Sequence, residues 1–309
     1  MQDPDVESWL TTSGARLLRR NELDYPAQLA ALADPPPVLY VLGDASLLQE
    51  PQIAVIGSRQ PTAAGRSLAA RMAGDLATAG LVITSGLARG IDAAAHEAAL
   101  AAGGKTIAVC GTGLDICYPA QHRALFERIA REGLLVSEFP PGTPPRAAHF
   151  PQRNRVISGL SRGVVVVEAA ADSGSLITAR HALAQGREVF AVPGSPLNPL
   201  AAGCLELLRQ GATLVRGAAD VLPEIAVKIE GNVHAHQQLG LPIAGAGGSS
   251  RLDKDYEMLL DALGFEPSTV DDLVERTGLG PGSIASMLLI LELEGRVEAR
   301  PGALYNRVA

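Results

Sequence analysis

The sequence has few cysteines and few aromatic residues. Its three cysteines, Cys110, Cys117 and Cys204, form no CxxC pair and have no histidine at metal-ligand spacing. We therefore expect neither a disulfide framework nor a zinc site, and the cysteine content fits a reducing compartment. Aromatic side chains make up only 4% of the 309 residues, so aliphatic side chains must fill most of the core.

Long apolar segments and targeting signals are also missing. No apolar run approaches the roughly 18 residues that a membrane-spanning helix needs. The first residues lack the basic region and the apolar region of a signal peptide. We expect no membrane span, no signal peptide and a cytoplasmic location.

Carboxylates are absent from residues 139–167 and from residues 51–74. Arginines without acidic neighbours, beside an aromatic ring, suit a phosphate-rich ligand whose bases can stack. The alternative is a solvated loop whose arginines pair with carboxylates distant in the sequence. The residues of the first window that raise this question are Arg146, Phe150, Arg153, Arg155 and Arg162.

Charge is unevenly distributed along the chain, which carries −7 in all. Residues 51–222 hold 12 acids and 16 bases, a net +4, whereas residues 1–50 and residues 251–309 each carry a net −5. The basic middle part predicts an anionic partner there. We expect residues 1–50 to be an approach segment, a cap or the remnant of a domain. Residues 223–250, which include a run rich in glycine and serine, are expected to be a flexible linker.

Short apolar runs alternate with helix-length segments through the middle of the chain. The runs are unbroken rather than alternating, which is typical of strands buried on both faces. Between the first two runs, Leu68, Met72 and Leu76 form one stripe of a helix. This alternation predicts right-handed βαβ units and a doubly wound, mostly parallel sheet in an α/β fold. The expected strands are Ile53–Ile56, Leu81–Thr84, Thr106–Val109, Leu134–Ser137, Val164–Val167 and Glu188–Val192.

Small residues follow five of these strands. The ligand crevice of such a sheet lies outside the carboxyl ends of its strands, where small residues let backbone N–H groups approach phosphates. Each turn alone is more simply an ordinary βα turn, but the five together favour an extended anionic ligand. A Walker A motif and a complete GxGxxG motif are both missing, which argues against a dinucleotide. The turns are Gly57-Ser58-Arg59, Ser85-Gly86, Gly111-Thr112-Gly113, Ser173-Gly174-Ser175 and Pro193-Gly194-Ser195.

Residues 251–309 predict three helices followed by a hairpin, which is a winged-helix arrangement. The expected helices cover Asp255–Leu263, a segment opening at Ser268, and Ser283–Leu291, and the hairpin joins residues 295–299 to residues 304–305. The third helix offers no Arg, Lys, Asn or Gln for reading DNA. Since this segment is also acidic, we favour a protein-contact module over a DNA reader.

A set of motifs between about residues 35 and 222 resembles the bacterial DNA-processing protein A family (DprA, also called Smf). The small C-terminal domain also resembles the winged helix that many members carry. The motifs are Ile53–Arg59, Thr84–Asp92 with His96, Gly111–Asp115 with Tyr118-Pro119, Ser137–Pro140, Phe150–Ser161, Ser173–Arg180 and Val192–Ser195.

The resemblance implies a Rossmann-like fold and a function. Members bind single-stranded DNA during natural transformation, protect it and help to load the RecA recombinase, without a cofactor or established catalytic activity. They form homodimers through one edge of the Rossmann-like domain, here the segment Asn198–Val215 with Cys204, Leu205, Leu207 and Leu208. Many carry an N-terminal helical SAM-like domain, of which residues 1–50 would be a stub.

The resemblance also implies a DNA pocket built from Arg59, Phe150 and a basic residue near Arg146. Ala147 stands where some relatives have lysine, so we expect Arg146 to take the place of that lysine. Arg59 is expected to open the first helix and join a phosphate at its N-terminus. Phe150 would stack a base or, alternatively, fill the core.

The remaining candidates belong to the same acid-free window and to the turns. Arg153 and Arg155 can contact further phosphates, and Asn154 is expected to fix the backbone of its loop. The turns at Gly57-Ser58 and Ser173-Gly174-Ser175 would present backbone N–H groups to the strand.

Two other functions stay open. An enzyme resembling Rossmann-like nucleotide phosphoribohydrolases would use Glu168 with the turn at residues 173–179, although their PGGxGT-type loop is missing. A transcription regulator would act through duplex binding by residues 251–309.

Overall fold

A computed structural model gives the structure of the chain, which divides into two compact units, Met1–Gln238 and Leu239–Ala309. Each unit is considered by itself. The expected linker falls almost wholly outside the described residues. The structure describes residues 4–225, 259, 262–263, 268–281, 283–284, 287–288, 291, 297–300 and 304–307.

The first unit is built on a nine-stranded sheet with the order β1-β2-β6-β5-β4-β3-β7-β8-β9. All neighbouring strands from β6 to β9 pair in parallel, whereas β2 pairs antiparallel with both β1 and β6. The strands are β1 (Arg16–Arg19), β2 (Val38–Gly43), β3 (Gln52–Ile56), β4 (Val82–Ser85), β5 (Thr106–Val109), β6 (Leu134–Ser137), β7 (Gly163–Val166), β8 (Glu188–Ala191) and β9 (Thr213–Leu214).

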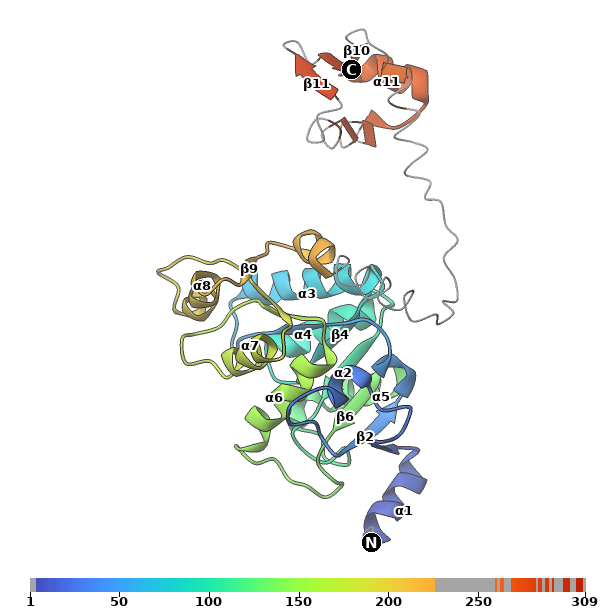
Figure 1. Cartoon of the computed structure of the whole chain (residues 1–309), viewed down its shortest axis with the longest axis vertical. Coiled ribbons are helices and arrows are strands. Elements are labelled where there is room, and N and C mark those ends of the chain that lie inside the picture. Colours follow the sequence, from blue (N-terminus) through green and yellow to red (C-terminus); the bar gives the residue numbers. More distant parts are fainter. Residues whose placement is uncertain are drawn as a thin grey trace. The chain divides into compact units, whose positions relative to one another are not determined.

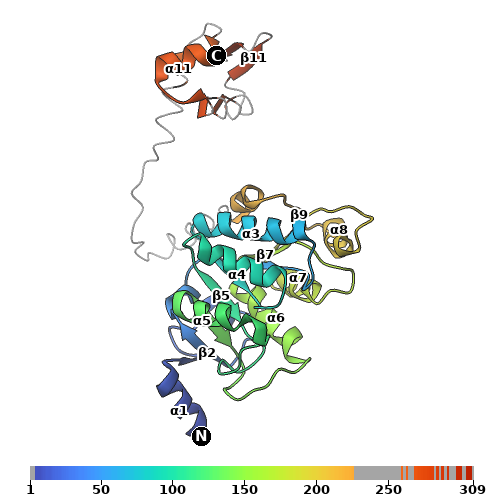
Figure 2. The same ribbon diagram turned by 180° about the vertical axis from the view of Figure 1, so that it is seen from behind.

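Helices cover both faces of this sheet, so that its strands are buried on both sides (Figures 1 and 2). Helices α3 and α4 pack together on one face, and α6 and α7 pack together on the other. The main helices are α1 (Pro4–Ser13), α2 (Ala27–Ala30), α3 (Ala63–Thr78), α4 (Ile91–Ala101), α5 (Arg123–Glu132), α6 (His149–Leu160), α7 (Ser175–Ala184) and α8 (Ala202–Arg209).

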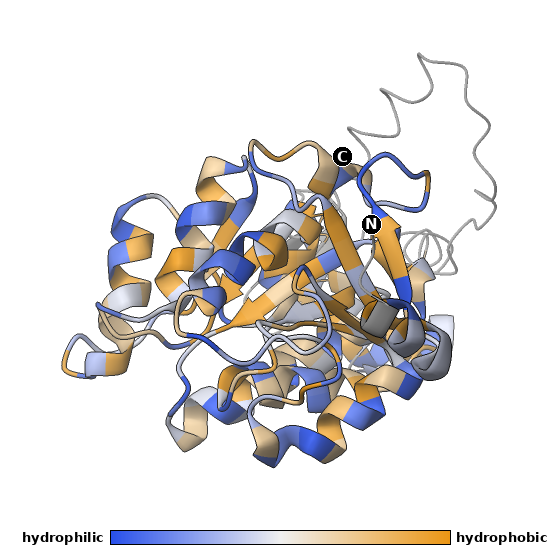
Figure 3. Cartoon of the chain, turned by 90° about the horizontal axis from the view of Figure 1, so that it is seen from below, coloured by the Kyte–Doolittle hydropathy of each residue, from blue (hydrophilic) through white to orange (hydrophobic). Residues whose placement is uncertain are grey.

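Alternate residues of each central strand enter separate cores on the two faces of the sheet. In β3, Ala54 packs with the α6–α7 layer, whereas Ile53 and Val55 pack with the α3–α4 layer. Figure 3 shows the apolar strands inside and helices with hydrophilic outer faces around them. Because both faces are covered, the strands carry unbroken apolar sequence, which confirms the predicted α/β, Rossmann-like fold.

Residues 1–50 supply two strands to the same sheet. Val38–Gly43 forms β2, which runs beside β6 with Tyr40 opposite Ser137, and β1 lies outside it. Leu29, Leu39 and Leu48 are fully buried in the core under α6. The segment expected to approach the sheet or to be a remnant of another domain therefore continues the sheet at one edge.

The stretch from His149 to Leu160, expected to be a loop, is helix α6. Its Pro151 sits in the first turn, where a missing N–H removes no hydrogen bond within the helix. Val156, Ile157 and Leu160 are buried on one side of the helix. Burial of this apolar stripe against the sheet explains why the segment is helical despite its proline and glycine.

The second unit contains a three-stranded sheet and helical segments. The hairpin predicted at residues 295–305 is present as β11 (Val297–Arg300) paired antiparallel with β12 (Leu304–Arg307), and β10 (Ser268–Thr269) completes the sheet. Thr269 caps α11 (Val270–Thr277) in a capping box with Asp272, as the acidic first turn indicates. Described residues of the first and third predicted helices are also helical, which agrees with a winged helix.

Candidate nucleic-acid interface

A crevice of about 710 Å³ opens at the carboxyl ends of β3 and β7. The order of the parallel strands reverses between these two neighbours, so the crevice lies at the switch point where such sheets bind ligands. Ten of the eleven residues predicted to bind DNA line it, and Arg155 does not. The ten are Gly57, Ser58, Arg59, Arg146, Phe150, Arg153, Asn154, Ser173, Gly174 and Ser175.

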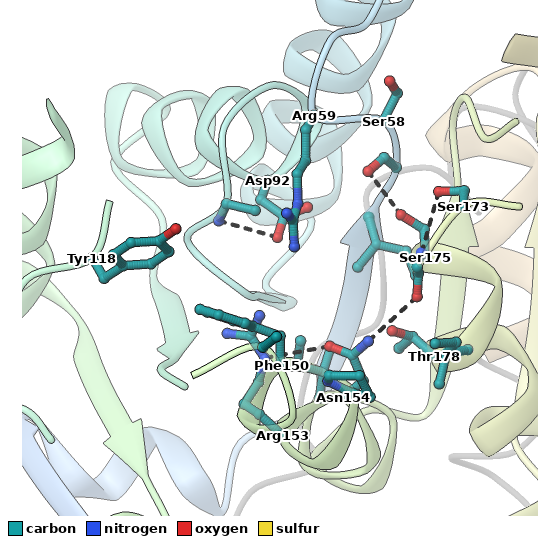
Figure 4. Close-up of a pocket in the computed structure, with 18 of the residues that line it drawn as sticks. Ser58, Arg59, Asp92, Tyr118, Phe150, Arg153, Asn154, Ser173, Ser175 and Thr178 are labelled. Carbon is teal, nitrogen blue, oxygen red and sulfur yellow. Dashed lines mark hydrogen bonds between the residues drawn. The ribbon is translucent and has the colours of Figure 1, made fainter. Parts of the chain in front are cut away.

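Arg59 reaches from the turn after β3 into the space above Phe150, which comes from the first turn of α6 (Figure 4). The guanidinium carbon lies 5.9 Å from the centroid of the Phe150 ring. No carboxylate in the described part of the chain lies within ion-pair distance of Arg59. An exposed cation and an aromatic face thus stand together without a counter-charge.

Helix α3 begins at Ala63, so the expectation that Arg59 opens this helix is wrong. The Glu168 carboxylate already holds the helix start, because it accepts hydrogen bonds from the Thr62 N–H at 2.8 Å and the Thr62 hydroxyl at 2.7 Å. A carboxylate at this position interacts favourably with the helix dipole. A phosphate beside Arg59 would therefore not rely on the N-terminus of α3.

The same contacts bear on the enzyme alternative. Glu168 is the acid that a phosphoribohydrolase-like reaction would use, and both of its carboxylate oxygens accept from Thr62. It does not line the crevice. The geometry assigns Glu168 to fixing the turn that carries Arg59, and it does not favour the enzyme.

Phe150 is half-buried rather than part of the core. Its ring packs against Gly111, where an added Cβ atom would come within 2.9 Å of the ring. The Tyr118 ring is 5.3 Å away, centroid to centroid, and 47% of Tyr118 is exposed. The crevice therefore offers two aromatic rings. The sequence did not predict Tyr118 as a residue of this site.

Arg153 lies in the floor of the crevice and is buried. Its Nη1 donates to the backbone carbonyls of Gly86 and Val109. The Asp92 carboxylate contacts the same turn and accepts from the N–H groups of Gly86 and Ala88 at 3.1 and 3.3 Å. Arg153 thus holds the strand ends in place, which is a different role from the phosphate contact expected of it.

Burial governs the charges of this floor. It raises the pKa of the Asp92 carboxyl and lowers the pKa of the Arg153 guanidinium, and the two opposite charges partly offset these effects. Among the described residues of the lining, Asp92 is the single carboxylate, whereas Arg59, Arg146 and Arg153 are cations. The crevice therefore carries a positive charge suited to an anion.

Arg155 does not line the crevice and pairs with carboxylates. Its Nη2 lies 2.6 Å from Glu138, whose side chain is only 6% exposed, and its Nε lies 3.5 Å from Asp34. The prediction of a phosphate contact is not supported for this residue. Glu138 is the residue just before the acid-free window, so the alternative of distant carboxylate partners holds for Arg155.

The opposite wall of the crevice is the turn before α7. Ser175 Oγ donates to the Gly57 carbonyl at 2.8 Å and so ties this turn to the one that carries Arg59. Asn154 Nδ2 donates to the Gly174 carbonyl at 3.4 Å, which links α6 to the same wall. Asn154 therefore joins two walls of the crevice and does not fix a loop of its own.

The remaining predicted residues differ in exposure. Arg146 is exposed at the rim. Cys204 and Leu207, expected at a dimer interface, are 0% and 4% exposed in the core and cannot contact a second copy directly, whereas Leu205 and Leu208 are half-buried. The described residues contain no cluster of potential metal ligands. None of the described helices is both long and apolar enough to cross a bilayer.

Fold and crevice together define a Rossmann-like α/β protein with a cationic crevice that presents aromatic rings at its switch point. The chain belongs to the DNA recombination-mediator protein A family, whose model matches residues 16–226. A model of the DprA winged helix domain matches residues 246–303. The family resemblance of the sequence motifs is therefore confirmed.

Curated relatives and solved structures agree with this membership. Protein Smf from Synechocystis is 38% identical over 94% of this chain and 80% of the relative, and Protein Smf from Escherichia coli is 42% identical over 95% and 78%. The structure of DprA from Streptococcus pneumoniae has a TM-score of 0.67 and 45% identity, covering 71% of this chain and 77% of its own. DNA processing protein A from Helicobacter pylori, described in a single-stranded DNA binding mode, has a TM-score of 0.62 and 33% identity over 70% and 96%.

Proposed function

We propose that this chain binds single-stranded DNA in the crevice without preference for sequence. The observation that carries the proposal is the placement of Arg59 above the half-exposed ring of Phe150. A phosphate can meet the guanidinium while a neighbouring base stacks on the ring. Every base offers a π-face, so stacking of this kind selects no particular base.

An unpaired strand suits this site better than a duplex. Bases in a duplex are already stacked on their neighbours, so they reach an aromatic ring only after unstacking, which costs a few kcal/mol. Phe150 and Tyr118 lie 5.3 Å apart in one crevice, within reach of adjacent unpaired bases. The single-stranded DNA binding mode of the Helicobacter pylori relative supports the same ligand.

The biological role that we propose follows the family. The chain would protect incoming single strands during natural transformation and load the RecA recombinase on them, in the cytoplasm, as a homodimer that needs no cofactor and catalyses no reaction. Membership in a family of recombination mediators supports this role. The winged helix would contact protein, and duplex binding by residues 251–309 alone would favour the transcription regulator instead.

Fluorescence anisotropy with labelled oligonucleotides of mixed sequence tests the proposal. We expect the intact chain to bind a single strand at least about tenfold more tightly than the matching duplex, because one favourable stacked base is worth about 1–3 kcal/mol. Equal or tighter binding of the duplex would contradict it. Release of free base from nucleoside monophosphates would instead identify an enzyme.

RecA loading has a separate readout. This readout is the lag before RecA forms a filament on a single strand that is covered by single-strand binding protein. We expect the chain to shorten this lag. An unchanged lag, with DNA binding intact, would leave a binding protein that is not a loader.

A further inference from the structure

A second cavity of about 150 Å³ lies at the other end of the parallel strands, where β3, β7 and β8 begin. Gln52 at the start of β3 lines it, whereas Ile56 at the end of β3 lines the crevice. Five residues of a strand span roughly 16 Å, so the two sites are separate. Two arginines, Arg162 just before β7 and Arg187 just before β8, stand on this second cavity.

Arg162 has no partner for its charge among the residues that the structure describes. Its side chain is half-buried, and within the described chain no hydrogen bond or ion pair of its guanidinium is present. Burial lowers the pKa of this guanidinium. A cation that is half-desolvated without a counter-charge destabilises the fold unless an anion joins it.

Arg187 is only partly satisfied. Its Nη2 donates to the carbonyls of Gln28 at 3.3 Å and Gly159 at 3.4 Å, and its Nε is buried without a partner among the described residues. Burial lowers the pKa of Arg187, and the nearby charge of Arg162 lowers it further. The hydrogen bond to the Gly159 carbonyl caps the end of α6 and so explains the position of Arg187 Nη2. It does not explain why Arg162 is half-buried beside it.

We infer that this cavity binds a phosphate-type oxyanion between Arg162 and Arg187. Guanidinium groups recognise phosphate oxygens through paired N–H donors, and one dianion would relieve the repulsion between the two cations. A cavity of this size fits a phosphate group but no drug-sized ligand, since pockets for such ligands start at about 300 Å³. Glu50 also lines the cavity, but it is exposed and pairs with neither arginine.

The oxyanion has two sources, free phosphate and the terminal phosphate of a nucleic-acid strand, which share the same chemistry. Both can be measured on the intact chain carrying Arg59→Ala, so that phosphate binding in the crevice contributes little. Isothermal titration calorimetry at constant ionic strength is carried out with inorganic phosphate. A second titration compares a short oligonucleotide bearing a 5′-phosphate with its 5′-hydroxyl counterpart.

We expect saturable binding of one phosphate per chain. Arg162→Gln should raise the Kd about tenfold or more, since it removes a charge-assisted hydrogen bond. Arg162→Lys keeps the charge but loses the paired N–H donors of the guanidinium, so its Kd should be intermediate. Arg71 is an exposed arginine of α3 outside both cavities, so Arg71→Gln should change the Kd less than twofold. Glu50→Gln should tighten binding about two- to fivefold, because it removes a nearby negative charge.

Two results would overturn the inference. One is the absence of saturable binding with both inorganic phosphate and the 5′-phosphorylated strand. The other is an unchanged Kd in Arg162→Gln and Arg162→Lys with circular dichroism showing that both fold. Tighter binding of the 5′-phosphorylated strand than of its 5′-hydroxyl counterpart, lost in Arg162→Gln, would support a terminal phosphate as the source.

Discussion

Arg59 and Phe150 are 91 positions apart in the sequence, and the fold places the guanidinium carbon of the first 5.9 Å from the ring centroid of the second. One follows β3 and the other opens α6, and both reach the switch point of the sheet. The tie from Ser175 to the Gly57 carbonyl and the support of the Phe150 ring by Gly111 hold the pair in this arrangement. A single strand that meets both side chains would have a phosphate bound by Arg59 and a neighbouring base stacked on Phe150, whichever base it is.

Stacking on Phe150 predicts that binding depends on the presence of bases. Phe150→Ala should weaken single-strand binding about 5- to 150-fold, which corresponds to about 1–3 kcal/mol for one stacked base. An oligonucleotide of abasic sites should bind the unaltered chain more weakly by at least this factor, because Tyr118 also loses a base to stack on. With that abasic oligonucleotide, Phe150→Ala should cause no further loss in anisotropy titrations, and a full further loss would mean that the ring does not stack a base.

Arg155 should serve stability rather than DNA binding. Arg155→Ala leaves the buried Glu138 carboxylate without its main partner and should lower the free energy of unfolding by about 3–5 kcal/mol. Replacing both residues, as Arg155→Leu with Glu138→Gln, should restore much of this stability. Urea denaturation measures both effects. Single-strand affinity should change less than twofold in the double variant, and a tenfold loss would return Arg155 to the binding site.

His96 should make stability depend on pH. It is fully buried, and its Nδ1 lies 2.6 Å from the Thr106 hydroxyl, which itself donates to the Ile83 carbonyl, so the proton sits on Nδ1. Burial lowers the pKa of His96 from 6.5 to about 3. Between these values the unfolded chain binds a proton that the folded chain does not, so stability falls as the pH falls.

The expected loss from His96 between pH 7 and pH 5 is about 2 kcal/mol. Urea denaturation at both pH values should show it, and His96→Gln should remove that share of the difference. The NMR signal of the His96 ring should also not titrate over this range. A ring that titrates near pH 6.5 in the folded protein would contradict the account.

The proposed homodimer can be tested at the half-buried residues of α8. Leu205→Arg or Leu208→Arg should convert a dimer to a monomer in light-scattering measurements, because a charge on an apolar interface is costly to bury. Leu23→Arg is the control, since Leu23 is fully exposed and lies outside the segment Asn198–Val215. A dimer that persists in both α8 variants would place the interface elsewhere.

The sequence predicts the central strands well because their signal is local. Buried parallel strands need unbroken apolar runs, and each predicted run overlaps an observed strand, from β3 to β8. Helix α6 is not predicted from the sequence because Pro151 and Gly159 disfavour a helix. A proline in the first turn is nevertheless compatible with one. Its helicity depends on burial against the sheet, which local propensity does not contain.

The crevice residues were foreseen as a set, but their roles were not. Counting acids in a window misses Glu138, one residue outside it, and cannot tell that Arg153 turns inward to the Gly86 carbonyl. Both outcomes depend on contacts between elements far apart in the chain. The sequence places Tyr118 in a motif but does not predict its role at the site, because only the fold brings its ring to within 5.3 Å of Phe150.

The most direct measurement compares Arg59→Ala with Arg71→Ala on one single-stranded oligonucleotide over a range of salt concentrations. Both residues are exposed arginines of the acid-free segment 51–74, and of the two only Arg59 lines the crevice. Each phosphate that a cation neutralises adds about −0.7 to the slope of log affinity against log salt. We predict that Arg59→Ala weakens binding about tenfold or more and reduces the slope by about 0.7, whereas Arg71→Ala changes neither. Equal effects of the two substitutions, or affinity that does not depend on salt, would contradict binding of single-stranded DNA in this crevice.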